Sequence, residues 1–400
     1  MIPALRKQFN ASFTPAKYQQ FLRRIDDVSG THVDFRLCET PCFFPKALVN
    51  QMAADGKDLI RQLVDNSEYH KLSDASIPAE FRVPNEAKYP MFIQVDFGLV
   101  RRPDGSLAPK LVELQAFPSL YAYQAQLAQA YVDVFHLREF AGGEGLRYFL
   151  NGLTNDSYRQ LLQRAILAGH DPANVILLEV DPLHQKTLPD FLLTEKLLGV
   201  KAVDISAVQK SGNRLFYENG GKSTPIHRIY NRAIVDELER RGVRPAFDWR
   251  DDLDVEWAGH PNWYFRISKF SIPFLHHESA PKTRFLDRLD RVPDDLQNYV
   301  LKPLYSFAGL GVVIGPSKAD IDGIPADKRD QYILQERVQF EPVIETPLGP
   351  TKAEVRVMYV WVDELQPVLT IIRMGRGLMM GVDHNKNMDW VGASAGLYVD

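Results

Sequence analysis

The spacing of apolar residues divides the chain into helical and strand-forming stretches. Residues 46–64 carry apolar side chains at roughly helical intervals, which predicts a helix. Residues 91–117 alternate with period two and predict two strands, whereas 119–168 predict helices from their Ala-, Gln- and Leu-rich pattern. The first third of the chain should therefore combine helices with one strand pair.

The middle of the chain changes to alternating strands and helices. Short, continuous apolar runs are typical of strands buried in a parallel sheet, and helical patterns separate them here. The predicted strands are 175–180, 200–205 and 227–230, and the predicted helices are 191–198 and 234–241. This alternation predicts a small Rossmann-like α/β layer.

Strand patterns dominate the last third and indicate an α+β unit rich in antiparallel pairing. They occur at 299–303, 311–314, 332–338, 354–362 and 367–374. A further apolar stretch, 391–399, should form an edge that pairs within the domain or with another subunit. We expect an α/β (α+β) fold in three regions: 1–150, 151–261 and 262–400.

The amino-acid composition argues against several classes of protein. The 400 residues are 45% hydrophobic and 24% charged, with a formal net charge of -4, so binding driven by phosphate neutralisation on a nucleic acid is disfavoured. No apolar run approaches the ~18–20 residues of a membrane span. The first residues contain no apolar signal-peptide core, and two cysteines, Cys38 and Cys42, exclude a disulfide scaffold. A cytoplasmic location is the default expectation.

The strand pair at 91–117 carries acidic and amide side chains on one face. A turn centred on Asp104-Gly105 would place Asp96 opposite Glu113 and Gln94 opposite Gln115. Adjacent carboxylates repel unless a cation or proton lies between them, and an oxygen-rich cluster suits Mg²⁺. The pattern fits a magnesium site, and equally an amphipathic hairpin with an exposed polar face.

A lysine and a glycine loop follow one another near residue 300. Lys302 lies inside an apolar strand pattern, where a buried cation needs an anionic partner. The loop from Ser306 contains Gly309 and Gly311, and such glycines let backbone amides approach an anion closely. A strand rather than a helix comes next, and G-K-[ST] is absent, so this is neither a P-loop nor a dinucleotide fingerprint.

Further candidate ligands lie on the flanking segments. In the strand pattern 332–338, Gln335, Glu336 and Val338 can meet a flat base and a ribose. Three basic residues in apolar settings can join Lys302 in a polyphosphate cradle: Lys269, Arg356 and Arg373. Arg228, Asn231 and Arg232 follow a strand and are candidates either for an anionic substrate or for simple surface charge.

These motifs together resemble the ATP-grasp superfamily, and within it the circularly permuted type of the glutathionylspermidine synthetase family. The matching segments are Gln94-Val-Asp96, Glu113-Leu-Gln115, Ser268-Lys-Phe-Ser-Ile-Pro273, Leu301-Lys-Pro303 and Ile372-Arg373. Gln94 and Gln115 depart from the Arg and Asn of that family. The resemblance implies an ATP-grasp fold with an inserted pre-ATP-grasp unit at 151–261, a metal hairpin within 1–150 and a nucleotide-binding region at 262–400.

The resemblance also implies an activity, namely ATP-dependent joining of a carboxylate to an amine or thiol through an acyl-phosphate. ATP would contact the residues named above, Mg²⁺ would bind Asp96, Glu113 and Gln115, and Arg373 and Lys302 would be catalytic. A linear ATP-grasp would instead take its metal ligands from Asp383, Asn385 and Asn387. A phosphotransferase and a non-catalytic nucleotide-binding scaffold are the alternatives. The expected partners are small-molecule or peptide carboxylates and amines, not nucleic acid or membrane.

Overall fold

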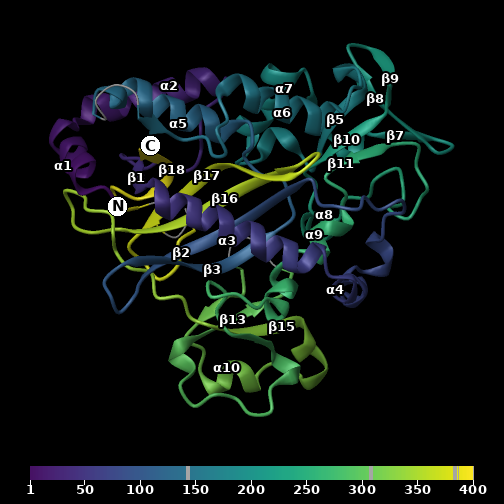
Figure 1. Cartoon of the computed structure of the whole chain (residues 1–400). Coiled ribbons are helices and arrows are strands. Elements are labelled where there is room, and N and C mark those ends of the chain that lie inside the picture. Colours follow the sequence, from purple (N-terminus) through teal and green to yellow (C-terminus); the bar gives the residue numbers. More distant parts are fainter. Residues whose placement is uncertain (141–144, 306–309, 382–384, 386, 400) are drawn as a thin grey trace.

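The fold is built around a central sheet that takes its strands from both ends of the chain (Figure 1). The computed structural model describes all residues except 141–144, 306–309, 382–384, 386 and 400. Within the described residues, the sheet order is β1-β18-β17-β16-β2-β3, with β4 also pairing with β18. The strands are β1 (Cys42–Pro45), β2 (Phe92–Arg101), β3 (Leu107–Gln115), β4 (Leu146–Arg147), β16 (Lys352–Trp361), β17 (Leu365–Gly375) and β18 (Gly392–Val399).

Helices cover both faces of this sheet. Helix α3 (Lys46–Val64) crosses one face and packs on alternate residues of β2, among them Val95 and Phe97. The opposite face is covered at one end by α1 (Pro3–Ser12), α2 (Pro15–Ser29) and α5 (Tyr123–Val134). Beyond these helices the same face turns polar, because β2 continues from Phe92 to Gln94 and Asp96.

A second, parallel sheet lies in the middle of the chain, in the order β11-β10-β5-β6. Its strands are β5 (Val175–Glu179), β6 (Lys201–Asp204), β10 (Arg228–Asn231) and β11 (Glu256–Ala258), accompanied by α6 (Asn155–Leu167), α7 (Leu188–Leu198) and α8 (Val235–Arg241). A strand meander is inserted between β6 and β10, formed by β7 (Gln209–Ser211), β8 (Arg214–Asn219) and β9 (Lys222–Ile226). The strand–helix alternation predicted for this region is confirmed.

A small antiparallel sheet forms a separate lobe beside the central sheet, at the bottom of Figure 1. Its order is β12-β15-β13-β14, with β12 (Thr283–Phe285), β13 (Tyr299–Pro303), β14 (Val313–Ile314), β15 (Tyr332–Glu336) and the short helix α10 (Lys318–Asp322). Two further short helices are α4 (Ser67–Leu72) and α9 (Asn262–Arg266).

The last third of the chain is not one α+β unit, because its strands belong to two sheets. Strands β12–β15 form the lobe, whereas β16–β18 complete the central sheet. Of the two alternatives expected for 391–399, pairing within the chain is confirmed, although the stretch forms an interior strand and not an edge. Strand β18 pairs within the chain and lies between β1, to which it is parallel, and β17, to which it is antiparallel.

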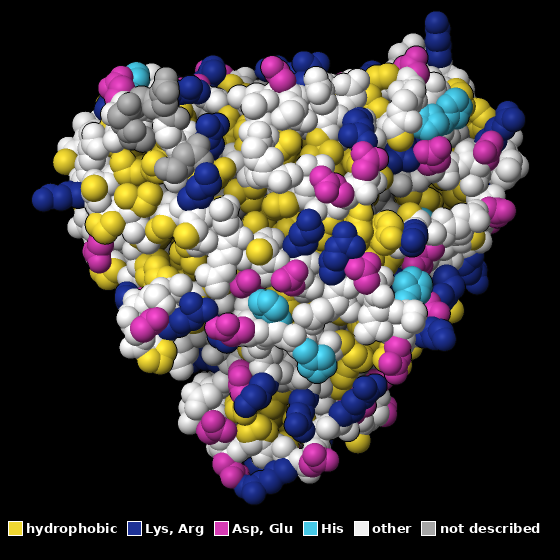
Figure 2. All heavy atoms as spheres, in the orientation of Figure 1, with side chains coloured by type: hydrophobic (Ala, Val, Ile, Leu, Met, Phe, Trp, Pro, Cys, Tyr) yellow, Lys and Arg dark blue, Asp and Glu magenta, His cyan; other side chains and the backbone are white. Residues whose placement is uncertain are grey.

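The distribution of charge on the surface and the state of the two cysteines agree with what the composition predicts. Figure 2 shows acidic and basic side chains interspersed over this face, without a large field of one sign. Cys38 and Cys42 are free and buried, and both thiols contact the sulfur of Met374. None of the described helices combines the length and apolarity needed to cross a membrane.

The packing of α3 on the sheet predicts the effect of one substitution. A Cβ at Gly56 would lie 2.1 Å from the hydroxyl oxygen of Tyr359, which donates a hydrogen bond to the backbone of Ala53. Ala favours helix over Gly by about 1 kcal/mol, but overpacking a core costs about 1–3 kcal/mol. We therefore expect Gly56→Ala to lower the free energy of unfolding in urea titrations. Asp58→Ala, an exposed position on the same helix, is the control; a Gly56→Ala variant as stable as wild type would contradict this packing.

Candidate functional site

A cavity of about 720 Å³ opens where the three sheets meet. The central sheet contributes strands β3, β16 and β17, the lobe contributes β13–β15, and the parallel sheet contributes the ends of β5 and β10. Of the predicted site residues, the structure places these along the cavity wall: Glu113, Gln115, Lys269, Lys302, Gln335, Val338, Arg356 and Arg373. Motifs up to about 260 residues apart in the sequence therefore meet in one place.

The cavity is cationic, although the protein carries a net negative charge. Its described lining contains seven Lys or Arg side chains and four Glu side chains. The basic residues are Arg232, Lys269, Lys302, Arg337, Lys352, Arg356 and Arg373. Low-dielectric walls with an excess of one sign concentrate ligands of the opposite sign, so this cavity suits an anion.

The predicted pairing of the strand pair is confirmed, although the register arises differently from the prediction. Asp96 lies opposite Glu113 and Gln94 opposite Gln115. The pairing shifts between Asp96 and Phe97, because Val112 is an extra residue on β3. Lys302 uses this bulge, since its Nζ donates to the carbonyl oxygen of Val112 at 2.9 Å.

Cross-strand charge pairs cover the polar face of the central sheet. Arg356 lies opposite Asp96, and its Nε and Nη2 each donate to one carboxylate oxygen at 2.6 Å. Arg373 lies opposite Glu354 and contacts both Glu354 and Asp96. Two guanidinium groups are therefore held by two buried carboxylates, and both line the cavity.

Burial and these charges shift the pKa values of the group. Burial alone would raise the pKa of Asp96, but Arg356 and Arg373 outweigh it and hold the pKa below the usual value. Burial raises the pKa of Glu354, against the opposing charge of Arg373. Burial lowers the pKa of Lys302 to about 8, despite the nearby Glu113.

The residues predicted to bind Mg²⁺ are only partly arranged for it. Glu113 and Gln115 line the cavity, whereas Asp96 is 1% exposed and both of its oxygens are bound by guanidinium groups. In the part of the chain that is described, no group of three or more His, Cys, Asp or Glu is arranged as a metal site. The magnesium ion stays a prediction.

The alternative metal ligands lie on a loop after β17. Asn385 is buried, and its amide bonds the backbone of Met379 and Gly381, so it shapes this loop. Asn387 is exposed, and Asp383 lies outside the described residues.

The lobe supplies the opposite wall. Gln335 is 2% exposed, lines the cavity and leaves its Nε2 without a hydrogen-bond partner among the described residues. Val338 and Phe340 line the same wall, and Gly98 of β2 permits their close approach, because a Cβ there would lie 2.8 Å from Val338. A buried amide donor between apolar groups suits the edge of a flat, polar ring.

The other predicted nucleotide ligands of the lobe are placed differently. Glu336 faces away from the cavity, and its carboxylate accepts from the backbone of Lys282 at 3.3 Å. Gly311 has φ of +73°, a conformation that favours glycine, and precedes the cavity-lining Val312. Ser306 and Gly309 lie outside the described residues.

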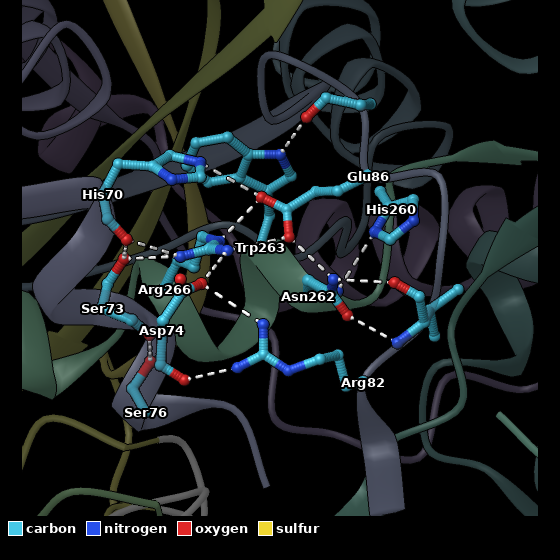
Figure 3. A network of polar contacts seen from close by, with 12 residues as sticks. His70, Ser73, Asp74, Ser76, Arg82, Glu86, His260, Asn262, Trp263 and Arg266 are labelled. Carbon is cyan, nitrogen blue, oxygen red and sulfur yellow. Dashed lines mark hydrogen bonds and ion pairs between the residues drawn. The ribbon is translucent and has the colours of Figure 1, made fainter. Parts of the chain in front are cut away.

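A buried polar network fixes the segment that carries Lys269 (Figure 3). Arg266, at the end of α9, is 3% exposed and bonds Glu86 at 2.7 Å and Asp74 at 2.6 Å. Ser268 then caps the next turn by accepting from the backbone of Phe270. Lys269 begins that turn and therefore enters the cavity from a rigid support.

Sequence reasoning missed most of the wall contributed by the parallel sheet. Glu179, Gln185, Thr187 and Glu237 line the cavity beside Arg232. The available signal was position, because Glu179 ends a buried parallel strand and ligands bind at the carboxyl ends of such strands. Arg228 instead bonds Glu256 and the backbone of α6 and lines a separate, smaller pocket, and Asn231 does not line the cavity.

Comparison with known proteins gives a likeness of fold. No family model and no curated protein matches the sequence. A glutathione synthetase-like effector from Globodera pallida, solved in its apo form, matches the structure with a TM-score of 0.55. The match covers 90% of this chain and 96% of that chain at 12% sequence identity. The two chains therefore share an overall fold, which in this protein is a mixed α/β arrangement.

The charge pairs predict a large effect of removing the shared carboxylate. Asp96→Asn leaves two half-buried guanidinium groups short of their shared, buried counter-charge, and breaking a buried pair from one side costs about 3–5 kcal/mol. We expect a drop of that size in the free energy of unfolding, measured by urea titration. Asp290→Asn is the matched control, because Asp290 is an exposed partner of Arg284; equal stability of the two variants would contradict the proposed dependence on Asp96.

Proposed function

We propose that the protein is an ATP-dependent ligase of the ATP-grasp type, which joins a carboxylate to an amine through an acyl-phosphate. The observation that carries the proposal is the cationic cavity where the three sheets meet, with an unsatisfied amide at its apolar end. The fold shared with a glutathione synthetase-like protein supports the same class. Adenine would lie against Val338 and Phe340 with its edge at Gln335, and the phosphates would extend toward the lysines.

The residues divide the chemistry between them. Lys269 and Lys302 bind the phosphates from the lobe side, and Arg356 and Arg373 bind them from the central sheet. With the phosphate charge neutralised, a carboxylate oxygen of the substrate attacks the γ-phosphorus, and ADP leaves with the electrons of the bridging P–O bond. Arg373 stabilises the charge that develops on the transferred group. Glu113 and Gln115 are the cavity-lining groups that would hold Mg²⁺, which would screen the phosphate oxygens when bound. Asp96 acts behind them by holding the arginines in position.

Nucleotide binding gives the first test. A ligand at 100 times its dissociation constant stabilises the folded state by about 2.7 kcal/mol. We expect Mg-ATP to raise the midpoint of thermal unfolding of the wild type, and Lys302→Ala to lose most of this shift. Lys318→Ala, which removes an exposed lysine of the same lobe, should keep it. A wild type that shows no shift at millimolar Mg-ATP would contradict the nucleotide site.

Turnover gives the second test and does not require the natural amine. Hydroxylamine captures acyl-phosphates as hydroxamates, so Mg-ATP, hydroxylamine and a panel of amino acids and short peptides should give ADP and a hydroxamate with the correct carboxylate. Arg373→Ala should abolish this product. Nucleotide binding without any hydroxamate would favour a non-catalytic scaffold, and ADP release with a phosphorylated product would favour a phosphotransferase.

A further inference from the structure

One part of the cavity lies apart from the proposed phosphate site and has no function in the scheme above. We call it the parallel-sheet arm, and its residues are Phe117, Ser119, Glu179, Gln185, Thr187, Arg232, Ile234 and Glu237. It is continuous with the rest of the cavity, because the segment 117–119 follows directly after Gln115 at the end of β3. Gln94 ties this segment to the central sheet by donating to the carbonyl oxygen of Ser119 at 2.8 Å.

The arm lies at the point in the parallel sheet where the strand order reverses. From β5 the chain first adds β6 on one side and later adds β10 on the other. Ligands of such sheets bind outside the carboxyl ends of the two strands that flank this reversal. Glu179 is the last residue of β5, and Arg232 follows β10, so both side chains occupy that position.

Among the carboxyl groups that line the arm, that of Glu179 has an oxygen available to contact a ligand. It is 3% exposed, and Oε1 accepts from the backbone N–H of Val180 at 2.9 Å; the described residues offer this carboxyl no other hydrogen bond. Glu237 differs, because Gln185 donates to it at 2.8 Å and Arg241 pairs with it at 3.0 Å. A buried carboxyl that keeps a free oxygen in a cavity can take a proton or a cation from a ligand.

Arg232 is fixed beside this carboxyl. It is 4% exposed, Nη1 donates to the carbonyl oxygen of Pro118, and the guanidinium lies 4.8 Å from the ring of Phe117 and 5.5 Å from that of Phe191. Its Nε is buried without a hydrogen-bond partner among the described residues. A polar atom left unpaired in a protein interior indicates a group that binds there, since the unpaired state costs about 1–3 kcal/mol.

We propose that the parallel-sheet arm binds the amine nucleophile of the ligation, and that Glu179 accepts its proton. This inference rests on the proposed ligase function. The bound ammonium group gives a proton to the free oxygen of Glu179, which breaks one N–H bond and restores the nitrogen lone pair. That pair forms the C–N bond at the acyl carbon, and phosphate leaves with the electrons of the C–O bond and takes up the second N–H proton, which gives the neutral amide.

The surroundings of Glu179 suit a proton acceptor that works near neutral pH. Burial raises its pKa to about 8, and the charge of Arg232 opposes this rise. Glu237 raises the pKa further, and Arg241 lowers it. Asp204 of β6 lies opposite Glu179 across the sheet, but its carboxylate is engaged by the backbone of Asp181. General bases are most effective when their pKa lies close to the working pH.

The test compares two nucleophiles on one acyl-phosphate. With the carboxylate that gives a hydroxamate, hydroxylamine is set against a pool of primary amines, namely the amino acids, ethanolamine, putrescine and spermidine. Hydroxylamine is uncharged at neutral pH and needs no proton acceptor before it attacks. We expect Glu179→Gln to form hydroxamate near the wild-type rate but to form amide at least about 100-fold more slowly, since general-base catalysis contributes about 10²–10⁴-fold. The amide oxygen of Gln can still accept from Val180, so this variant should fold.

The pH profile and two further variants complete the experiment. In the wild type, kcat/KM for amide formation should rise as the pH increases through about 8, and Glu179→Asp should restore part of the amide rate. Glu218→Gln makes the same chemical change on the exposed strand β8 and should behave as wild type.

Each other result has a distinct meaning. A wild type that forms no hydroxamate defeats the proposed function, and the present inference with it. If the wild type forms hydroxamate, the inference alone fails in three cases: when Glu179→Gln loses both products, when it keeps both, or when the wild type transfers the acyl group to none of the amines.

Discussion

The arrangement of the cavity depends on one buried carboxylate, that of Asp96, which binds two guanidinium groups at once. Arg356 and Arg373 come from neighbouring strands, and both contact this one carboxylate. The carboxylate offsets the cost of burying both cations and fixes their direction toward the cavity. A site with an excess of positive charge is thereby kept inside a protein whose net charge is negative.

The backbone bulge in β3 likewise serves two contacts at once. The bulge at Val112 restores the pairing of Asp96 with Glu113 and also frees a carbonyl oxygen for Lys302. One irregularity therefore aligns the carboxylates of the central sheet and holds the lysine of the lobe. The network around Arg266 has a comparable effect on Lys269, because it ties α9 to the segment near Asp74 and Glu86. The lobe is joined to the central sheet by the hydrogen bond from Lys302 to Val112.

Much of the local structure followed from the sequence, and the reasons are physical. Alternation with period two identified β2, β3 and β16 and placed Glu354, Arg356 and Met358 on one face, and an apolar run identified β17. The helix at 46–64 and the strand at 299–303 were predicted with their observed bounds. Pairing between strands distant in the sequence was harder to predict, because the hydrophobic pattern of one strand does not show which strand lies beside it. The position of β18 inside the sheet, the bulge at Val112 and the capture of Asp96 by two arginines all depend on partners distant in the sequence.

The position of β18 also bears on how the chain acquires its structure. This strand lies between β1 and β17, so the N-terminal strand reaches the sheet through the residues at 392–399. During synthesis, more than half of the chain must be made after β1 and after the pair β2–β3 before their partners β18 and β16 are present. The strands of the lobe at 283–336, in contrast, pair with strands close to them in the sequence. Such non-local pairing is slow, and it exposes strand edges until it is complete. A ribosome that stalls before residue 392 would release a chain with an open sheet edge, a natural substrate for chaperones.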